Sequence, residues 1–221
     1  MKAVILYSGG LDSMTLLGVA NSMGFTELLT IGFDYGQPHD HCRLPTDAVK
    51  KRHGIIESVL CPTPLLGPAC SLVSEDVDVP KRQDPRAPGV PNTWVPARNL
   101  VFLSHAANYA AAKDATDIFI GVNQLDFSGY PDCRSGFISA VELAMRTGVS
   151  VDFKIHTPLI QMKKTEIIEL GLSLGVDYSE TQSCYDPMTS GESCGECDSC
   201  QLRLEAFVML GYEDPIHYVT S

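Results

Sequence analysis

The start of the chain alternates apolar runs with helical spacing. Ala3 to Tyr7 is an uninterrupted apolar run that Ser8-Gly9-Gly10 breaks, which is typical of a strand buried on both faces of a parallel sheet. Apolar residues at helical spacing then cover Leu11 to Met23, and a second apolar run covers Leu28 to Phe33. The order strand, turn, helix, strand predicts two parallel strands joined by a right-handed crossover.

The rest of the chain continues this alternation with one long interruption. Cys61 to Asn92 is rich in proline and predicts a long loop with one short strand. The remaining patterns predict three helices and one buried strand: helices over Arg98 to Asp114, over Gly136 to Gly148 and around Ile167, Leu170 and Leu174, and a strand over Asp117 to Val122. The predicted fold class is therefore α/β, with an open, mainly parallel sheet and helices on both faces.

Composition and charge narrow the class of partner. The chain has 221 residues, 44% of them hydrophobic, and a net charge of −11. An acidic surface repels nucleic acid, and although a local basic patch could still exist, we expect no nucleic-acid partner. The short apolar start is no signal peptide or membrane span, which predicts a cytoplasmic protein without a membrane partner. Its eight cysteines are then expected to be thiols or metal ligands.

The break after the first strand reads Ser8-Gly9-Gly10-Leu11-Asp12-Ser13. Glycines allow the backbone to approach a ligand closely, and the free N–H groups of the following helix favour an anion. Asp12 would either orient Mg²⁺ or accept backbone N–H groups of the loop. A plain glycine-rich turn is the alternative, but the full string resembles the PP-loop signature of ATP pyrophosphatases, which grip the pyrophosphate of ATP.

Four cysteines cluster near the end of the sequence. Cys194, Cys197 and Cys200 have the spacing C-x-x-C-x-x-C, and Cys184 precedes them by ten positions. Four thiolates with short spacings predict a closed, structural zinc site. An iron–sulfur cluster is the second interpretation and free thiols the third. We predict that residues 181–221 form a zinc-binding segment packed on an ATP-binding domain of residues 1–180.

Further binding candidates follow the predicted strands or begin the predicted helices. The segment after Val122 carries carboxylates, a ring and a guanidinium that suit a guanine-like edge and a substrate carboxylate. Arg98 opens a helix, where its charge opposes the helix dipole, which hints at a nearby anion. Substrate-binding candidates are Arg98, Asn123, Asp126, Tyr130, Asp132 and Arg134. Asp34, Tyr35 and Gln37 are candidates for the adenosine pocket, and Lys163 or Lys164 could reach phosphates.

Taken together, these strings resemble the 7-cyano-7-deazaguanine synthase (QueC) family of PP-loop enzymes, whose fold is adenine nucleotide alpha hydrolase-like. The resemblance rests on SGGLDS, FDYGQ (33–37), VPARN (95–99), IGVNQLDFSGYPDCR (120–134), KIHTPL (154–159) and SCYDP…CGECDSCQLR (183–203). It implies a ligase that uses ATP, Mg²⁺ and ammonia to convert 7-carboxy-7-deazaguanine, through an adenylated acid and an amide, into the nitrile.

The resemblance also assigns residues. It implies an ATP loop from Tyr7 to Leu17 and zinc on Cys184, Cys194, Cys197 and Cys200. From the chemistry of their side chains we expect catalytic roles for Ser8, Asp12, Ser13, Arg98 and Lys163. A homodimer is one assembly that the sequence allows, although the sequence does not determine the oligomeric state. The chain departs from the family at residues 38–44 and at Lys163, where a small capping residue is usual. A tRNA-thiolating PP-loop enzyme, a specialised deazapurine-modifying homologue and a non-catalytic nucleotide-binding zinc module are the alternatives.

Overall fold

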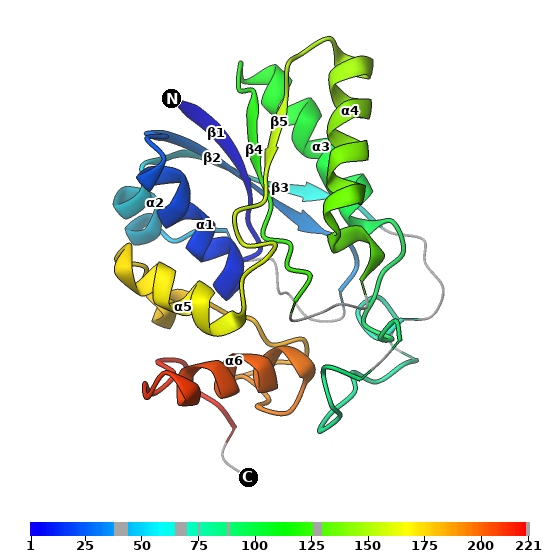
Figure 1. Ribbon diagram of the computed structural model, residues 1–221. Helices are drawn as coiled ribbons and strands as arrows, with labels where there is room; N and C mark the ends of the chain where they lie inside the picture. Colours follow the sequence, from blue (N-terminus) through cyan, green and yellow to red (C-terminus); the bar gives the residue numbers. More distant parts are fainter. Residues whose placement is uncertain (38–43, 65–69, 75, 88, 126–129, 220–221) are drawn as a thin grey trace.

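A computed structural model describes residues 1–37, 44–64, 70–74, 76–87, 89–125 and 130–219. Its centre is a sheet of five parallel strands in the order β3-β2-β1-β4-β5 (Figure 1). The strands are β1 (Lys2–Leu6), β2 (Glu27–Asp34), β3 (Ile55–Pro62), β4 (Asp117–Phe119) and β5 (Lys154–His156). The predicted parallel pair is therefore the pair β1 and β2.

Helices cover both faces of this sheet. α1 and α5 lie on one face, and α3 and α4 on the other (Figure 1). The helices of the described chain are α1 (Leu11–Ser22), α2 (Asp47–His53), α3 (Arg98–Ala112), α4 (Ser135–Val149), α5 (Lys164–Ser173) and α6 (Asp198–Met209), with 3₁₀ turns η1 (Pro131–Cys133) and η2 (Tyr178–Glu180). This arrangement confirms the predicted fold class.

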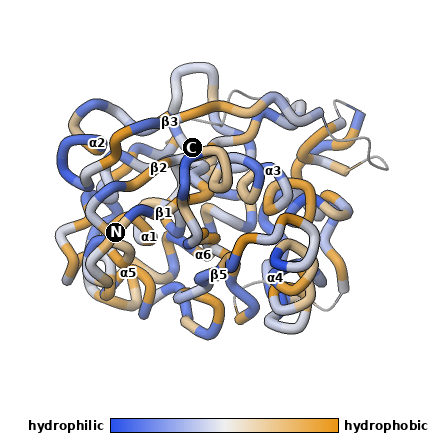
Figure 2. Tube along the Cα trace, turned by 90° about the horizontal axis from the view of Figure 1, so that it is seen from above, coloured by the Kyte–Doolittle hydropathy of each residue, from blue (hydrophilic) through white to orange (hydrophobic). Residues whose placement is uncertain are grey.

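The continuous apolar pattern of β1 has the expected cause. Ala3 and Ile5 belong to the hydrophobic cluster beneath α1 and α5, whereas Val4 and Leu6 belong to the cluster beneath α3 and α4. A strand buried on both faces needs apolar residues at every position. Figure 2 shows hydrophobic and hydrophilic residues alternating along the flanking helices, as expected for elements with one buried side.

The predicted strand over Asp117 to Val122 is too long. β4 ends at Phe119, and Ile120 contributes one more ladder hydrogen bond, from its N–H to the carbonyl of His156 at 3.1 Å. Beyond this bond the chain passes beneath α1, where a Cβ at Gly121 would lie 3.3 Å from the Cβ of Asp12. The chain therefore leaves the sheet at the point where it meets the phosphate turn.

The long loop and the C-terminal segment contact one another. In the described part of residues 63–97, the strand-like feature is one antiparallel bridge between Lys81 and Cys197. α6 lies beside α5, and Ala206 and Phe207 belong to the cluster beneath α1. The division of the chain at residue 180 stays a prediction. No helix in the described part of the chain combines the length and hydrophobicity that a membrane crossing requires.

Candidate functional site

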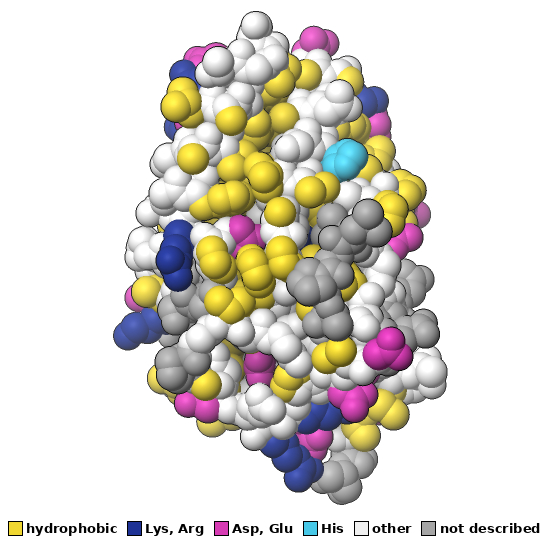
Figure 3. All heavy atoms as spheres, turned by 90° about the vertical axis from the view of Figure 1, so that its right-hand side faces the viewer, with side chains coloured by type: hydrophobic (Ala, Val, Ile, Leu, Met, Phe, Trp, Pro, Cys, Tyr) yellow, Lys and Arg dark blue, Asp and Glu magenta, His cyan; other side chains and the backbone are white. Residues whose placement is uncertain are grey.

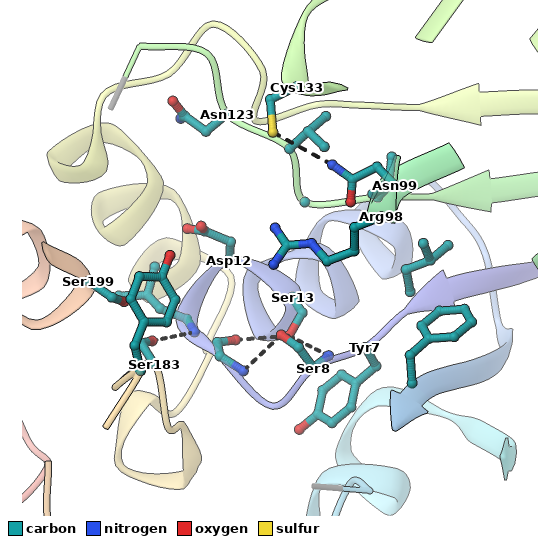
Figure 4. Close-up of a pocket in the computed structure, with 18 of the residues that line it drawn as sticks. Tyr7, Ser8, Asp12, Ser13, Arg98, Asn99, Asn123, Cys133, Ser183 and Ser199 are labelled. Atoms are coloured by element: carbon teal, nitrogen blue, oxygen red, sulfur yellow. Dashed lines mark hydrogen bonds between the residues drawn. The ribbon is translucent and has the colours of Figure 1, made fainter. Parts of the chain in front are cut away.

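A cavity of about 330 Å³ opens at the carboxyl ends of the central strands (Figure 4). Tyr7 and Ser8 reach it from the end of β1, Tyr35 from the end of β2, and Gly121 and Asn123 from the segment after β4. β1 and β4 are neighbours whose connections run in opposite directions, to β2 and to β5. Ligands of open parallel sheets bind at such a switch point.

Hydrogen bonds within the glycine turn fix its shape at the bottom of the cavity. The N–H of Gly10 donates to Ser8 Oγ at 3.3 Å, and Ser13 Oγ donates to the carbonyl of Gly10 at 3.0 Å. Gly9 has φ +81°, a conformation that a residue with a Cβ rarely adopts. The first amide of α1, on Leu11, donates to Ser183 Oγ at 3.1 Å. The amides of Gly10 and Leu11 are thus paired with hydroxyls, and the positive end of the α1 dipole at this turn favours an anion.

Asp12 points into the cavity and pairs with a lysine. Lys164 Nζ lies 2.8 Å from one carboxylate oxygen of Asp12 and 3.0 Å from the other. Asp12 accepts no backbone N–H from the described residues, so the loop-capping alternative is wrong. Lys163 is exposed, outside the cavity, and its N–H donates to Glu166. Of the two adjacent lysines, the structure therefore places Lys164 at the site.

Arg98 is the first residue of α3 and its guanidinium enters the cavity (Figure 4). The backbone reaches this position through Ala97 at φ +59°. The guanidinium lies 5.9 Å from the ring centroid of Tyr35, within the range of a cation–π contact. Among the described residues it forms no ion pair and no side-chain hydrogen bond, although the charge of Asp132 acts on it. A half-buried cation without an ion pair favours an anionic ligand beside it.

Asp132 lies next to this helix but does not line the cavity. Its two oxygens accept from the Nε1 of Trp94 and from the N–H of Asn99, each at 3.2 Å. Because Asn99 is in the first turn of α3, Asp132 acts as a cap for that helix. Arg134 is exposed and also outside the lining. Asp126 lies outside the described residues.

Two other predicted substrate residues do line the cavity. Tyr130 is buried, shares a 2.6 Å hydrogen bond with Thr93, and has a pKa raised by burial. Asn123 donates from Nδ2 to the carbonyl of Leu159 at 3.1 Å and accepts at Oδ1 from the N–H of Leu125 at 2.8 Å. Its amide therefore holds two loops together at the edge of the cavity.

The nucleotide candidates divide in a similar way. Tyr7, Gly10, Leu11, Ser13, Tyr35 and Gln37 line the cavity, while Gly9, Leu17 and Asp34 do not. Leu17 is fully buried in the core beneath α1. Phe33 and Phe102 stack at 4.0 Å in the cavity wall. No sequence argument had selected Phe102, Asn99, Ser183, Tyr185 or Arg203, which line it as well.

The four clustered cysteines come together as predicted. Their sulfur atoms lie within 4.8 Å of one another, and a tetrahedral zinc with ~2.3 Å bonds needs sulfur atoms ~3.8 Å apart. Backbone N–H groups of Asp186 and Cys194 donate to Cys184 Sγ at 3.3 and 3.2 Å. Donors of this kind stabilise thiolates. The chemistry of four such sulfur atoms fits a zinc ion.

A buried arginine joins the cysteine segment to the rest of the site. Arg203 of α6 is 2% exposed and pairs with Asp214, from Nε at 2.7 Å and from Nη2 at 2.8 Å. Its Nη1 donates to Thr181 Oγ1 at 2.7 Å and to Ser183 Oγ at 3.4 Å. Since Ser183 also accepts from Leu11, a chain of hydrogen bonds runs from α6 to the glycine turn.

Comparisons with known proteins show the family to which the chain belongs. The sequence matches the family model "Queuosine biosynthesis protein QueC" over residues 2–211. It is 49% identical over 222 residues to 7-cyano-7-deazaguanine synthase of Citrifermentans bemidjiense, covering 98% of this chain and 97% of that protein. The synthase of Geotalea daltonii is 50% identical over 223 residues (98% and 96%), and that of Solidesulfovibrio magneticus 46% over 228 (100% and 97%). The chain therefore belongs to the QueC family of queuosine biosynthesis proteins.

Proposed function

We propose that this chain is an ATP-dependent ligase that converts 7-carboxy-7-deazaguanine and ammonia into 7-cyano-7-deazaguanine. Family membership supports this reaction and the use of ATP. The observation that carries the proposal is the pairing of two anion sites in one cavity. The N-terminus of α1 at the glycine turn favours an anion at one end, and Arg98, which forms no ion pair within the described chain, supplies a cation. Adenylation of an acid brings two anions together and needs both sites.

In the first activation, a carboxylate oxygen of the substrate attacks the α-phosphorus of ATP and the bond to pyrophosphate breaks. The turn from Ser8 to Ser13 would hold the leaving pyrophosphate with backbone N–H groups and hydroxyls. Arg98 would hold the substrate carboxylate by two parallel hydrogen bonds. Positioning of the two reactants in this way removes much of the entropic cost of their encounter.

Ammonia then attacks the activated carbonyl carbon, AMP leaves, and loss of a proton gives the amide. The amide oxygen attacks the α-phosphorus of a second ATP and pyrophosphate leaves. Loss of AMP and of both protons of the amide nitrogen then gives the nitrile. The stacked rings of Phe33 and Phe102 offer an apolar wall for a flat heterocycle. Two consecutive activations of the same carbon explain why one phosphate turn and one cation would serve both steps.

Two metal ions complete the proposal. Mg²⁺ would neutralise phosphate charge when bound, and Asp12 is the carboxylate among the described lining residues that could hold it. Lys164 would then be released from Asp12 towards the phosphates. A structural zinc would be held by Cys184, Cys194, Cys197 and Cys200, outside the chemistry.

The test is a reaction with purified protein, ATP, Mg²⁺, ammonia and 7-carboxy-7-deazaguanine, followed by mass spectrometry. We expect the nitrile, with two AMP formed for each nitrile. Turnover without the nitrile, or AMP formation that does not depend on the acid, would reject the proposal. The same assay with thiolation substrates addresses the alternative PP-loop chemistry, for which we expect no product.

A homodimer is part of the proposal as well. Hydrophobic side chains gather on the face shown in Figure 3, and Leu100 of α3 and Leu143 of α4 are exposed, the latter by 67%. Apolar surface of this kind supports association with a second copy. Light scattering on the purified protein should give twice the mass of 24.0 kDa; a monomer at working concentration would reject this part.

A further inference from the structure

Ser183 lies beside the glycine turn although it is distant in sequence. Its Oγ accepts from the N–H of Leu11 at 3.1 Å, across 172 positions of the chain. A Cβ placed on Gly10 would lie 3.4 Å from Ser8 Oγ and 3.6 Å from Ser183 Oγ. The two hydroxyls therefore flank Gly10, one from the turn itself and one from the cysteine segment. Both serines line the cavity (Figure 4).

The hydrogen-bond partners of Ser183 fix what its hydroxyl can offer. A serine hydroxyl has one hydrogen to donate and two lone pairs that accept. Leu11 N and Arg203 Nη1 are both obligatory donors, at 3.1 and 3.4 Å, so they occupy the two acceptor positions. Within the described chain no acceptor takes the remaining hydrogen. The O–H of Ser183 is thus left to donate to a third partner in the cavity.

We propose that Ser183 donates this hydrogen to a phosphate oxygen at the pyrophosphate end of the bound nucleotide. The inference rests on the proposed use of ATP and adds a binding residue from outside the glycine turn. An anion is the partner that suits a hydroxyl whose lone pairs are already taken. Ser183 stands where the donors of α1 already favour negative charge.

Arg203 acts in this scheme as a positioning residue. Its ion pair with Asp214 and its bond to Thr181 Oγ1 fix the guanidinium in a buried place. The guanidinium can therefore only donate a hydrogen bond to Ser183 Oγ. The hydroxyl hydrogen of Ser183 cannot be donated to Arg203 and is directed elsewhere. Both partners adjoin the cysteine cluster, since Ser183 precedes Cys184 and Arg203 lies one helical turn after Cys200. The cysteine segment thereby completes the phosphate site.

The test measures the binding of pyrophosphate, ATP and AMP to the full-length, metal-loaded protein by calorimetry. Ser183→Ala should weaken pyrophosphate and ATP by about 10-fold or more, the effect of one hydrogen bond to a charged group. AMP should bind as to the unchanged protein. Ser183→Thr keeps the hydroxyl and should restore most of the affinity. Ser173→Ala, on the exposed side of α5, is the matched control and should change nothing.

The outcomes separate this inference from the proposed function. If the unchanged protein binds neither ATP nor pyrophosphate, the proposed function fails. If it binds both and Ser183→Ala binds pyrophosphate equally well or more tightly, the inference fails, because Leu11 N alone then serves the anion. If Ser183→Ala does not fold, Ser183→Cys replaces it in the test. Its sulfur atom still lies near Leu11 N, but its S–H is a weak donor. The same loss of pyrophosphate affinity is expected for that variant.

Discussion

Replacing Arg98 by methionine should separate activity from stability. Methionine keeps the length and apolar stem of the side chain but removes the guanidinium. In the described chain that group forms no ion pair, and its visible contact is with the ring of Tyr35 at 5.9 Å. Removing a desolvated charge and a weak cation–π contact therefore has opposing effects. We expect the free energy of unfolding to change by less than ~1 kcal/mol.

The effect on turnover should be much larger. Two hydrogen bonds to a substrate carboxylate, at ~1.5 kcal/mol each, contribute ~3 kcal/mol, which corresponds to a fall in kcat/KM of about 150-fold. The assay follows AMP release with 7-carboxy-7-deazaguanine, and urea unfolding gives the stability. Arg146→Met, on the far end of α4 with Glu142 and Asp152 as neighbours, is the control. A folded Arg98→Met enzyme with more than a tenth of normal kcat/KM would refute this reasoning.

Three further predictions concern the charges and the metal. Lys164→Met should lower kcat/KM at least ~10-fold, as expected for lost charge-assisted hydrogen bonds, whereas Lys163→Met should change it less than ~2-fold; equal effects would reject the placement of Lys164. Asp214→Asn should lower the free energy of unfolding by ~3–5 kcal/mol in urea melts, because the buried charge of Arg203 loses its partner; a loss below ~1 kcal/mol would contradict that. Chelation of the metal should lower the melting temperature, and elemental analysis should find one zinc per chain; iron in its place would favour the alternative cluster.

The central half of the sheet could be predicted from the sequence because its elements are strongly patterned. β1 and α1 have continuous apolar and helical spacing, and both were predicted to within about one residue at either end. β3 was missed because it is an edge strand in which Glu57 and Ser58 interrupt the apolar pattern. β5 has only three residues, too few for any period to show. α6 begins inside the cysteine motif, which concealed it.

The candidate site was predictable only where a local string determines it. The glycine turn and the four cysteines are such strings, and both come together as expected. The choice between Lys163 and Lys164 was not accessible, because neighbouring helical residues point about 100° apart and the helix start decides which one faces Asp12. Asp132 looked like a base-reading carboxylate, yet its acceptors are used by Trp94 and Asn99. Which partners occupy the oxygens of Asp132 depends on the tertiary structure and cannot be deduced from the local sequence.

The distance in sequence between Leu11 and Ser183 has a consequence for synthesis of the protein. The two ends of this hydrogen bond are 172 residues apart, so at translation rates of about 5–20 residues per second the first leaves the ribosome roughly 9–34 s before the second. During this interval a nascent chain has the glycine turn without its later partner. The protein therefore binds ATP with its full set of contacts only after synthesis has passed Ser183. ATP stabilises the fold fully only from that point on.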